Sequence, residues 1–343
     1  MSNLAKINIF RRKITKGLTR NIGKNRFIVK GVTPKKILIV RPNHRLGNTL
    51  LITPLILEIS KQFPDSKIDL FVKGTVANVL FENYTQVDQI LCLPKKHFKE
   101  LFLYFKTWFR LRLKKYDLVI NTTKGSSSGR LATKLSRAPY KFYGEIEDNP
   151  YNKLPDYEHF AKFPVYNFWA YLELSGRAIP EKNIPVLSLK LSAEELQNGQ
   201  EKLHEIIPDK NKPTIAIFTF ATGDKCYSEQ WWEKLYQAML AEFKDYNLIE
   251  ILPVENISQI QHKAPTYYSK DIREITAVMA NTSIFIGADS GMMHLSVSSG
   301  TTTIGLFHVT DPTRYGPYGN KNCSLNTTGL STEEIIKEIK DRL

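Results

Sequence analysis

The sequence predicts an α/β protein with parallel sheets that are covered on both faces by helices. Three observations predict this class. From residue 36 onward, short apolar runs alternate with amphipathic segments of helical period. With 343 residues, of which 42% are hydrophobic, the chain is long enough to bury two ordinary cores. Residues 145–185 are rich in Tyr, Pro, Asn and Phe and separate two such series, so we expect two domains joined by a linker that ends near Pro185.

The first series opens with the apolar run Ile-Leu-Ile-Val at residues 37–40, which is typical of a strand buried on both faces. A polar loop at 41–47 follows, and the apolar spacing after it predicts one helix over residues 48–63. The same two patterns predict further strands at 68–72, 90–93, 117–122 and 141–143, and helices at 76–81, 96–114 and 130–137.

The linker holds one expected helix, at 163–176, and the second series follows it. Its expected strands are 213–220, 247–252, 284–286 and 303–307, and its expected helices are 228–243, 271–280 and 292–299. A terminal helix is expected at 331–343, because it begins with the capping box Ser-Thr-Glu-Glu. Within residues 283–319, the order strand, polar turn, helix, strand and Gly/Pro-rich loop predicts free backbone N–H groups and a carboxylate at the ends of parallel strands. Such a place suits a phosphate-bearing, hydroxyl-rich ligand.

Composition excludes several classes of protein. The three cysteines, Cys92, Cys226 and Cys323, lie far apart and fit neither a disulfide framework nor a zinc site, so a reducing, cytoplasmic compartment is expected. No apolar run approaches the roughly 18 residues that a membrane span needs, and the N-terminus lacks the apolar core of a secretory signal. We therefore expect a soluble or peripheral protein.

Positive charge is concentrated in a leader at the N-terminus. Residues 1–36 hold eleven Lys and Arg and no Asp or Glu, so they account for most of the formal net charge of +14. Apolar residues recur there at three- and four-residue spacing, at Leu4, Ile7, Phe10, Ile14 and Leu18. We interpret residues 1–35 as an arm that lies on an anionic membrane. A disordered, solvated tail is the alternative, and nucleic-acid binding is disfavoured because no nucleic-acid-binding motif accompanies the charge.

A loop with possible chemistry follows the first strand. Gly47 and Asn48 at a helix start can approach a phosphate or a sugar closely, while Arg41, His44 and Arg45 offer positive charge. A polar turn with an ordinary helix cap at Asn48 or Thr49 is an equally good interpretation of this stretch. Taken alone, His44 has the character of a solvent-facing loop residue rather than of a base.

Two more loops follow strands of the second series. Thr222 and Gly223 can supply a hydroxyl and a backbone donor to a phosphate, and Lys225 can neutralise its charge, although the spacing of a Walker A loop is absent. Glu255, just past the next strand, can hold the two hydroxyls of a ribose. The alternatives are a plain surface lysine and an ordinary exposed glutamate.

The most informative loop joins the strand at 284–286 to its helix. Asp289, Ser290, Gly291 and His294 gather there within a few residues between two buried runs. Asp289 alone could be a helix cap. The group holds more polar detail than a cap needs, so we predict a functional site.

These stretches resemble glycosyltransferase family 9, the ADP-heptose:lipopolysaccharide heptosyltransferase family. The similarity covers nearly the whole chain from Lys36 and rests on KILIVRPNHRLGNTLLITPLI at 36–56, ATGDKCYSEQWWEKL at 221–235 and GADSGMMHLSVSSGTTTIGLFHVTDPTRYGPYG at 287–319. The last is the most specific, since it matches the family's Asp-Ser/Thr-Gly…His and Phe-Gly-x-Thr-x-Pro elements with His308 in place of a glycine. The resemblance implies a GT-B type fold of two Rossmann-like domains, with parallel sheets that face a central cleft.

The resemblance also implies inversion at the anomeric carbon with no metal and no cofactor, and the chain has no Asp-x-Asp metal clamp. By position, Thr222 and Lys225 would bind the donor phosphates, Glu255 the ribose and Asp289 the transferred sugar. Ser290, Gly291 and His294 would complete the donor site beside the pyrophosphate. Arg41, Arg45 and Gly47 would contact the acceptor. We accordingly expect an arm (1–35), an acceptor-binding domain (36–180), a sugar-nucleotide-binding domain (181–330) and the terminal helix (331–343).

One departure concerns catalysis. The best-known members carry Gly-Asp where this chain has Gly47-Asn48, and that aspartate is taken as the base. An amide cannot accept a proton, so His44 or phosphate oxygens of the substrates are candidates for the base, and loss of catalysis is a third possibility. Lys225-Cys226-Tyr227-Ser228 also departs from the family's usual Lys-Arg-Trp-Pro, which leaves the nucleoside open.

The resulting hypothesis is an inverting glycosyltransferase that moves a heptose-like sugar from a nucleotide, with ADP favoured, to anionic lipopolysaccharide core or a related surface glycan. It would work as a peripheral protein at the cytoplasmic face of the inner membrane. The alternative is a catalytically silent sugar-nucleotide-binding subunit that partners an active transferase. A dinucleotide-dependent oxidoreductase is disfavoured, because no GxGxxG follows any expected strand.

Overall fold

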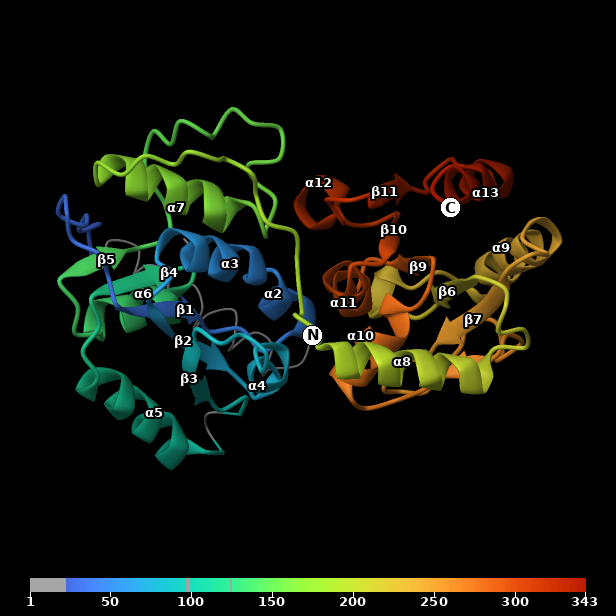
Figure 1. Cartoon of the computed structure of the whole chain (residues 1–343), viewed down its shortest axis with the longest axis horizontal. Coiled ribbons are helices and arrows are strands. Elements are labelled where there is room, and N and C mark those ends of the chain that lie inside the picture. Colours follow the sequence, from blue (N-terminus) through green and yellow to red (C-terminus); the bar gives the residue numbers. More distant parts are fainter. Residues whose placement is uncertain (1–22, 97–98, 124) are drawn as a thin grey trace, which may run out of the picture. The chain divides into compact units, whose positions relative to one another are not determined.

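The computed structural model describes residues 23–343 except 97, 98 and 124, and these residues form two compact units (Figure 1). Unit 1 holds the described residues up to Arg45, Pro54–Tyr157 and Ala161–Pro185. Unit 2 holds Leu46–Thr53, Glu158–Phe160 and Val186–Leu343. Residues 46–53 therefore belong to unit 2, although the sequence places them in the first domain.

Unit 1 is built on a five-stranded sheet with the order β3-β2-β1-β4-β5, in which every neighbouring pair is parallel. The strands are β1 (Lys36–Arg41), β2 (Lys67–Lys73), β3 (Val87–Leu93), β4 (Leu118–Asn121) and β5 (Tyr140–Phe142). The central strand β1 is buried from Ile37 to Arg41, as its apolar run predicts. The chain starts in the middle of the sheet, adds β2 and β3 on one side and then crosses to add β4 and β5 on the other.

Helices cover both faces of this sheet. They are α4 (Val76–Leu80), α5 (Leu101–Leu113), α6 (Ser127–Leu135) and α7 (Phe163–Leu174), together with most of α3 (Thr53–Gln62). On one face, Leu111 of α5 and Ala132 of α6 pack in one cluster with Leu38 and Val40. Figure 1 shows α7 beside α3, and Trp169 Nε1 of α7 donates a hydrogen bond to Glu58 Oε1 of α3 at 2.8 Å.

The segment before β1 is part of unit 1. Arg26 forms an antiparallel bridge with Lys141, and Ile28 is buried. Asn25 donates from its amide to the Glu145 carbonyl and accepts from the Tyr143 N–H. Of the expected arm 1–35, residues 23–35 are thus described as part of a folded unit, and the predicted amphipathic helix lies outside the described residues.

Unit 2 repeats the plan with six parallel strands in the order β11-β10-β9-β6-β7-β8. The strands are β6 (Thr214–Phe218), β7 (Asn247–Ile251), β8 (Thr266–Tyr267), β9 (Ile284–Ala288), β10 (Thr302–Phe307) and β11 (Cys323–Asn326). The chain again starts in the middle, at β6, adds β7 and β8 on one side, and crosses over to β9. The prediction of two parallel α/β sheets is confirmed.

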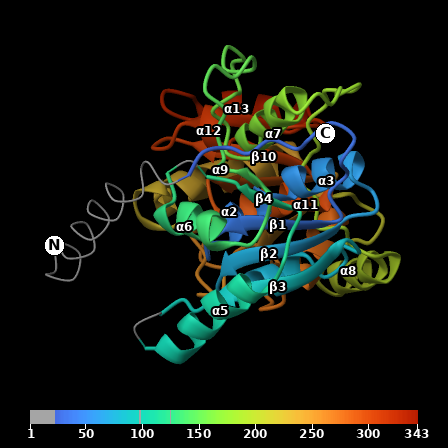
Figure 2. The ribbon, with the colours of Figure 1, turned by 90° about the vertical axis from the view of Figure 1, so that its left-hand side faces the viewer.

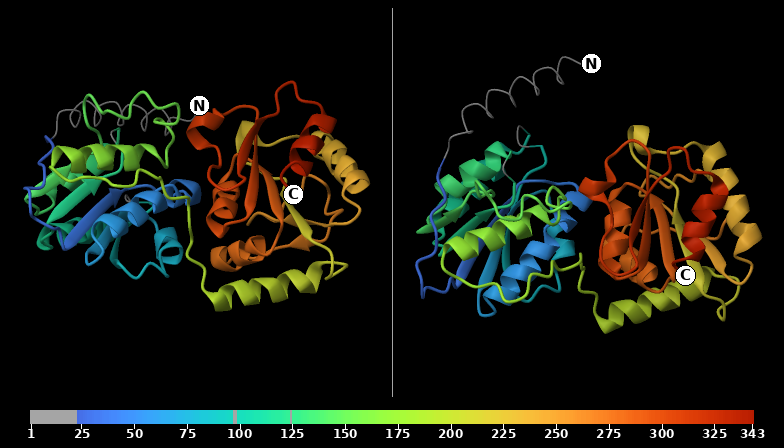
Figure 3. Two further views of the ribbon diagram at one scale, coloured as in Figure 1. Left: turned by 45° about the horizontal axis from the view of Figure 1, so that its top comes forward. Right: turned by 90° about the horizontal axis from the view of Figure 1, so that it is seen from above.

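The helices of unit 2 are α2 (Leu46–Leu50), α8 (Ala193–Ile206), α9 (Glu229–Glu242), α10 (Ile272–Ala280), α11 (Gly291–Ser299), α12 (Pro312–Tyr315) and α13 (Thr332–Lys340), with a short 3-10 turn, η1 (Gly223–Lys225). One core cluster joins Trp232 of α9 and Ile339 of α13 to the strands. Figure 3 shows α8, in yellow-green, running alongside the sheet of unit 2, and it packs on α10. Gly199 makes that packing close, since a Cβ there would lie 2.4 Å from the Ala277 backbone.

Several expected elements differ in the structure. The helix expected at 48–63 is two helices, α2 and α3, interrupted at Leu51–Ile52; α3 restarts at Thr53 with Pro54 in its first turn, where proline is tolerated. The helix expected from residue 96 begins at Leu101. Helices α8 and α12 and strands β8 and β11 were not expected. Within the described part of the chain, none of the helices combines the length and apolar character of a membrane span.

Candidate functional site

The candidate site of unit 2 lies where the carboxyl ends of its strands meet. Because all neighbouring strands are parallel, the loops after β6, β7, β9 and β10 leave the sheet at the same edge. The strand order reverses between β6 and β9, which are hydrogen-bonded neighbours. In open α/β sheets, ligands bind outside such a reversal point. The loops after β6 and β9 carry Lys225 and Asp289.

An ion pair joins these two loops. Lys225 Nζ lies 3.3 Å from Asp289 Oδ2, and Thr310, in the loop after β10, donates its hydroxyl to the same oxygen at 2.7 Å. Asp289 is nearly buried, whereas the Lys225 side chain is one-third exposed. Three loops that are far apart in the sequence thus place an ammonium group, a carboxylate and a hydroxyl together. Thr310 is the threonine of the Phe-Gly-x-Thr-x-Pro element, yet the sequence alone predicted no role for it.

The helix α11 begins directly beside this pair. Ser290, not Asp289, is its cap, because the Ser290 hydroxyl accepts from the Met293 N–H. The Asp289 side chain is therefore available for other partners, and the alternative of a simple cap does not hold. The first N–H groups of a helix have no partner within the helix, and they carry the positive end of its dipole. Ser290 and Gly291 put this positive end next to Lys225.

His294 faces away from solvent and toward α2. It is 5% exposed, and a Cβ built on Gly47 would lie 2.8 Å from its Cδ2 atom. Burial holds the pKa of His294 well below its usual value, although Asp289 acts in the opposite direction. The imidazole is therefore neutral at pH 7. The structure brings His294 together with Gly47, which the sequence assigned to the acceptor, and gives both a packing contact.

The other predicted residues of unit 2 lie on its surface. Thr222 is exposed at the start of η1. Glu255 is exposed in a tight turn in which the Asn256 N–H donates to the Pro253 carbonyl at 2.8 Å. Asn48 is half-buried on α2. The roles assigned to Thr222, Glu255 and Asn48 stay predictions.

The loop after β1 in unit 1 carries the remaining predicted residues. Arg41 is buried and donates from its guanidinium to the Thr123 hydroxyl. Arg45 and His44 are exposed. Partial shielding from water, followed by the charges of Lys73, Lys95 and Arg45, lowers the pKa of His44. His44 is consequently neutral at pH 7, with one ring nitrogen able to accept a proton.

Sequence reasoning missed a buried carboxylate under the loop that carries Glu255. Glu250, fully buried in β7, accepts hydrogen bonds from the hydroxyls of Thr219 and Ser258. The Gln259 N–H donates in turn to Thr219 Oγ1 at 2.9 Å. Burial raises the pKa of Glu250, against the effect of the two hydroxyls. The signal was a charged residue inside the apolar strand NLIEI, which has to be paired when it is buried.

A cluster of rings around Tyr227 was also missed. His308 lies 4.2 Å from the Tyr227 ring, which lies 4.0 Å from the Trp231 ring, measured between centroids. One ring nitrogen of His308 is 2.9 Å from the Asp224 carbonyl oxygen, and the Tyr227 hydroxyl is 2.8 Å from Thr327 Oγ1. These contacts hold η1 against the loop after β10. The departures from the family pattern at Tyr227 and His308 therefore fall on residues that touch each other.

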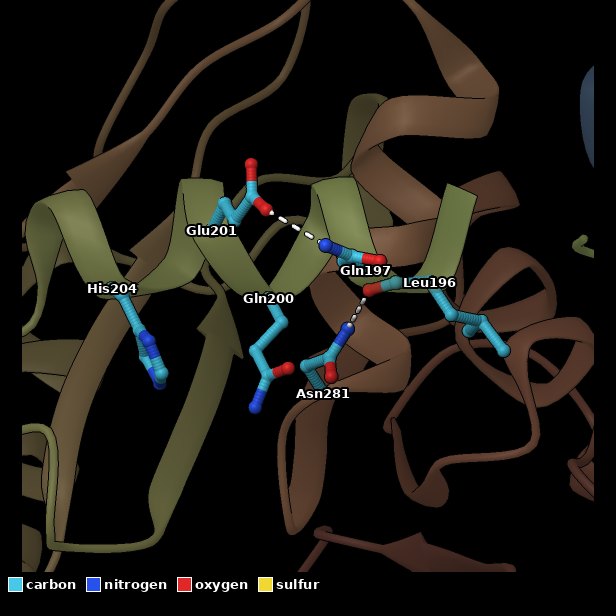
Figure 4. A pocket seen from close by; sticks show the side chains of 6 residues that line it. All are labelled: Leu196, Gln197, Gln200, Glu201, His204 and Asn281. Carbon is cyan, nitrogen blue, oxygen red and sulfur yellow. Dashed lines mark hydrogen bonds between the residues drawn. The ribbon is translucent and has the colours of Figure 1, made fainter. Parts of the chain in front are cut away.

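A hollow of about 470 Å³ elsewhere on unit 2 is lined by Leu196, Gln197, Gln200, Glu201, His204 and Asn281 (Figure 4). Gln197 bonds Glu201 at 3.2 Å, and Asn281 donates to the Leu196 carbonyl at 2.9 Å. Asn281 lies just before β9, at the amino ends of the strands. This hollow is thus at the edge of the sheet opposite Lys225 and is no part of the candidate site.

A family described as "Glycosyltransferase family 9 (heptosyltransferase)" matches residues 254–338, which include Asp289, Thr310 and the start of α11. Lipopolysaccharide heptosyltransferase 3 of Escherichia coli is 24% identical over 309 residues, covering 80% of this chain and 84% of that protein.

Two solved structures have the same fold. A glycosyl transferase family 9 protein from Veillonella parvula aligns with a TM-score of 0.69 at 19% identity, covering 92% of each chain. The E. coli heptosyltransferase WaaC, solved with ADP, aligns with a TM-score of 0.66 at 15% identity, covering 90% of this chain and all of that one. These likenesses confirm the GT-B type of the fold.

Proposed function

We propose that this chain moves a heptose-like sugar from ADP to lipopolysaccharide core or a related surface glycan. The premise is that the chain belongs to glycosyltransferase family 9 and is a glycosyltransferase. Two findings support the donor and the acceptor. A relative that spans most of the chain is named a lipopolysaccharide heptosyltransferase. A structural neighbour of the same fold was solved with ADP. The proposed place of action is the cytoplasmic face of the inner membrane.

The observation that carries this proposal is the Lys225–Asp289 pair beside the start of α11. When a glycosyl group leaves a nucleoside diphosphate, negative charge develops on the diphosphate. An ammonium group and the N–H groups of a helix start can stabilise that charge without a metal. Asp289, held by Thr310, is placed to orient Lys225 and to accept hydrogen bonds from sugar hydroxyls. Thr222 and Glu255 would extend this donor site toward the phosphates and the ribose.

Inversion at the anomeric carbon needs a base that removes the proton from the acceptor hydroxyl. We assign this role to His44, since its lowered pKa keeps the imidazole neutral and Asn48 has no basic atom. The reaction then breaks the bond between the anomeric carbon and the diphosphate oxygen and forms the bond to the acceptor oxygen. The proton passes to His44. Arg41, Arg45 and Gly47 would position the anionic acceptor beside it.

Thermal stabilisation by ADP-, GDP- and UDP-sugars tests the donor. We expect the ADP-sugar to raise Tm most, and Lys225→Ala to abolish the shift, because bound ligand stabilises the folded state. Lys234→Ala, at an exposed lysine of α9, is the matched control and should keep the full shift. Equal shifts for Lys225→Ala and Lys234→Ala would contradict the donor site.

Turnover of His44→Gln and Asn48→Asp tests the base. We expect His44→Gln to lower kcat by about 100-fold or more with little change in KM. The acidic limb of the wild-type pH–rate profile should lie below pH 6.5, and Lys73→Gln or Lys95→Gln should move it to higher pH, because either change removes a charge that lowers the pKa of His44. Transfer by Asn48→Asp but not by wild type would instead support the silent, sugar-nucleotide-binding subunit.

Metal independence is part of the proposal. Among the described residues, no group of three or more His, Cys, Asp and Glu side chains is arranged to hold a metal ion. We expect transfer to proceed at an unchanged rate after extensive dialysis against EDTA. A loss of activity that Mg²⁺, Mn²⁺ or Fe²⁺ restores would contradict this expectation.

A further inference from the structure

Helix α5 of unit 1 exposes a stripe of large apolar side chains. Phe102, Phe105, Phe109 and Leu113 are 82%, 64%, 63% and 58% exposed. Their spacing of three and four residues places them on one side of the helix. Figure 2 shows α5 at the outside of unit 1.

The opposite side of α5 already has its packing partners. Leu111 and Thr107 are buried there, and Leu111 belongs to the core cluster of the sheet. Trp108 meets the Phe71 ring edge to face, with centroids 5.1 Å apart. The packing of unit 1 therefore uses the opposite face of α5 and does not need the apolar stripe. Four neighbouring side chains of this size on one exposed face indicate a binding surface.

Positive charge flanks the stripe on both sides. With about 100° between successive residues, Lys106 and Arg110 fall on one flank and Arg112 on the other, and all three are exposed. Lys99 and Lys115 extend the charge beyond the two ends of the helix, and Glu100 is the one acid within residues 99–115. An apolar stripe between two rows of cations is the pattern of a helix that lies in a membrane interface.

We propose that α5 docks unit 1 onto an anionic bilayer, with Phe102, Phe105, Phe109 and Leu113 inserted among the lipids and Lys106, Arg110 and Arg112 at the phosphate groups. The long stems of these cations let their charges reach the headgroups while the rings lie deeper. A second copy of the chain is a poor occupant, because it would bring like charges together along both flanks. This inference does not depend on the proposed reaction, and α5 is a different part of the chain from residues 1–35.

Flotation of the full-length protein with lipid vesicles tests the inference. One set of vesicles contains phosphatidylcholine alone, and the other contains 30% phosphatidylglycerol. We expect Phe102→Ser/Phe105→Ser/Phe109→Ser to lower the partition coefficient for the anionic vesicles at least about tenfold. Leu174→Ser/Leu240→Ser removes two exposed leucines elsewhere and should bind as wild type does. Residues 1–35 are unchanged in all these proteins, so any difference belongs to α5.

Charge and depth are tested separately. Arg110→Gln/Arg112→Gln should weaken binding to the anionic vesicles roughly fivefold for each charge removed and leave weak binding to phosphatidylcholine unchanged. Phe105→Trp should be quenched by lipids that are brominated on their acyl chains, whereas Leu174→Trp should not be. Wild-type binding by the triple serine variant, or an unquenched Trp at position 105, would overturn the inference. If the stripe binds a protein instead of lipid, the triple serine variant should bind vesicles as wild type does and the Trp at position 105 should stay unquenched.

Discussion

The close approach of Gly47 to His294 is the residue-scale feature that ties α2 to the candidate site. A Cβ at residue 47 would lie 2.8 Å from His294 Cδ2 and 3.4 Å from Gly291 Cα. Both neighbours belong to α11, whose first turn lies beside Lys225. Gly47 is needed here for space and not for an unusual backbone angle.

We therefore expect Gly47→Ala to lower the free energy of unfolding by about 1–3 kcal/mol, because the buried imidazole has to move. Urea unfolding measures this change. Gly125→Ala is the control, since nothing lies within 4 Å of a Cβ at that position. Equal stability of the two variants would show that the contact between α2 and α11 is looser than the structure has it.

His294 gives a prediction of pH dependence. Its pKa is lowered in the folded state, so below its ordinary pKa of about 6.5 the unfolded chain binds a proton that the folded chain does not. Stability should fall as the pH is lowered from 6.5 to 5, with about 1–2 kcal/mol of the loss due to His294. Urea unfolding at both pH values should show that His294→Gln lacks this part of the loss. His262→Gln, at an exposed histidine, should retain it.

At the scale of elements, most of the sheet could be predicted, because buried parallel strands are continuous apolar runs. β1, β6 and β9 are examples. Strands β8 and β11 lack such a run, since β8 has two residues and β11 is half polar. Helix α8 carried a readable signal, the capping box of Ser192 and Glu195, but its sequence is polar apart from a few positions. The break between α2 and α3 had a local signal, Pro54, which lies in the first turn of α3, where proline is tolerated.

The candidate site was predictable to a similar degree. Lys225 and Asp289 could be named because each follows an apolar run that predicts a strand. Their direct ion pair, and the hydroxyl that Thr310 donates to the same Asp289 oxygen, could not be predicted, since both require the strand order of the sheet. The hydrogen bonds of Glu250 could not be predicted for another reason: its partners, Thr219 and Ser258, lie 31 and 8 residues away in the sequence.

Ser258 connects that buried carboxylate to the loop after β7. Its hydroxyl lies 2.6 Å from Glu250 Oε2 and also accepts from the Ile260 and His262 N–H groups. Ser258→Ala should therefore lower stability by about 1–3 kcal/mol, because it removes a donor from a buried carboxylate. Amide hydrogen exchange should speed up in residues 254–262, and nucleotide binding should weaken if Glu255 holds the ribose. Ser283→Ala, at an exposed serine, should change neither.

At the scale of the whole molecule, the two units use one topology twice. In each, the chain starts in the middle of the sheet and reverses its strand order beside the first strand. In unit 2 the Lys225–Asp289 pair lies at this reversal, and in unit 1 Arg41, at the end of β1, bonds Thr123, after β4. The repeated placement supports the proposal that unit 1 offers an anion site to the acceptor as unit 2 does to the donor.

The charge of the molecule leads to the last prediction. Residues 1–22 carry six Lys and Arg and no acid, so their deletion should weaken binding to anionic vesicles strongly at 0.1 M salt and far less at 1 M salt, where the Debye length is about 3 Å. The deletion should end at residue 22, because Asn25, Arg26 and Ile28 belong to the fold of unit 1. Vesicle flotation at the two salt concentrations provides the measurement. Unchanged binding at 0.1 M salt would refute a membrane role for the leader. If binding persists after the deletion but is lost in the α5 serine variant, α5 alone attaches the protein to the membrane. Stable anchoring of a peripheral protein takes two weak contacts or one strong one, and α5 would then be the one strong contact.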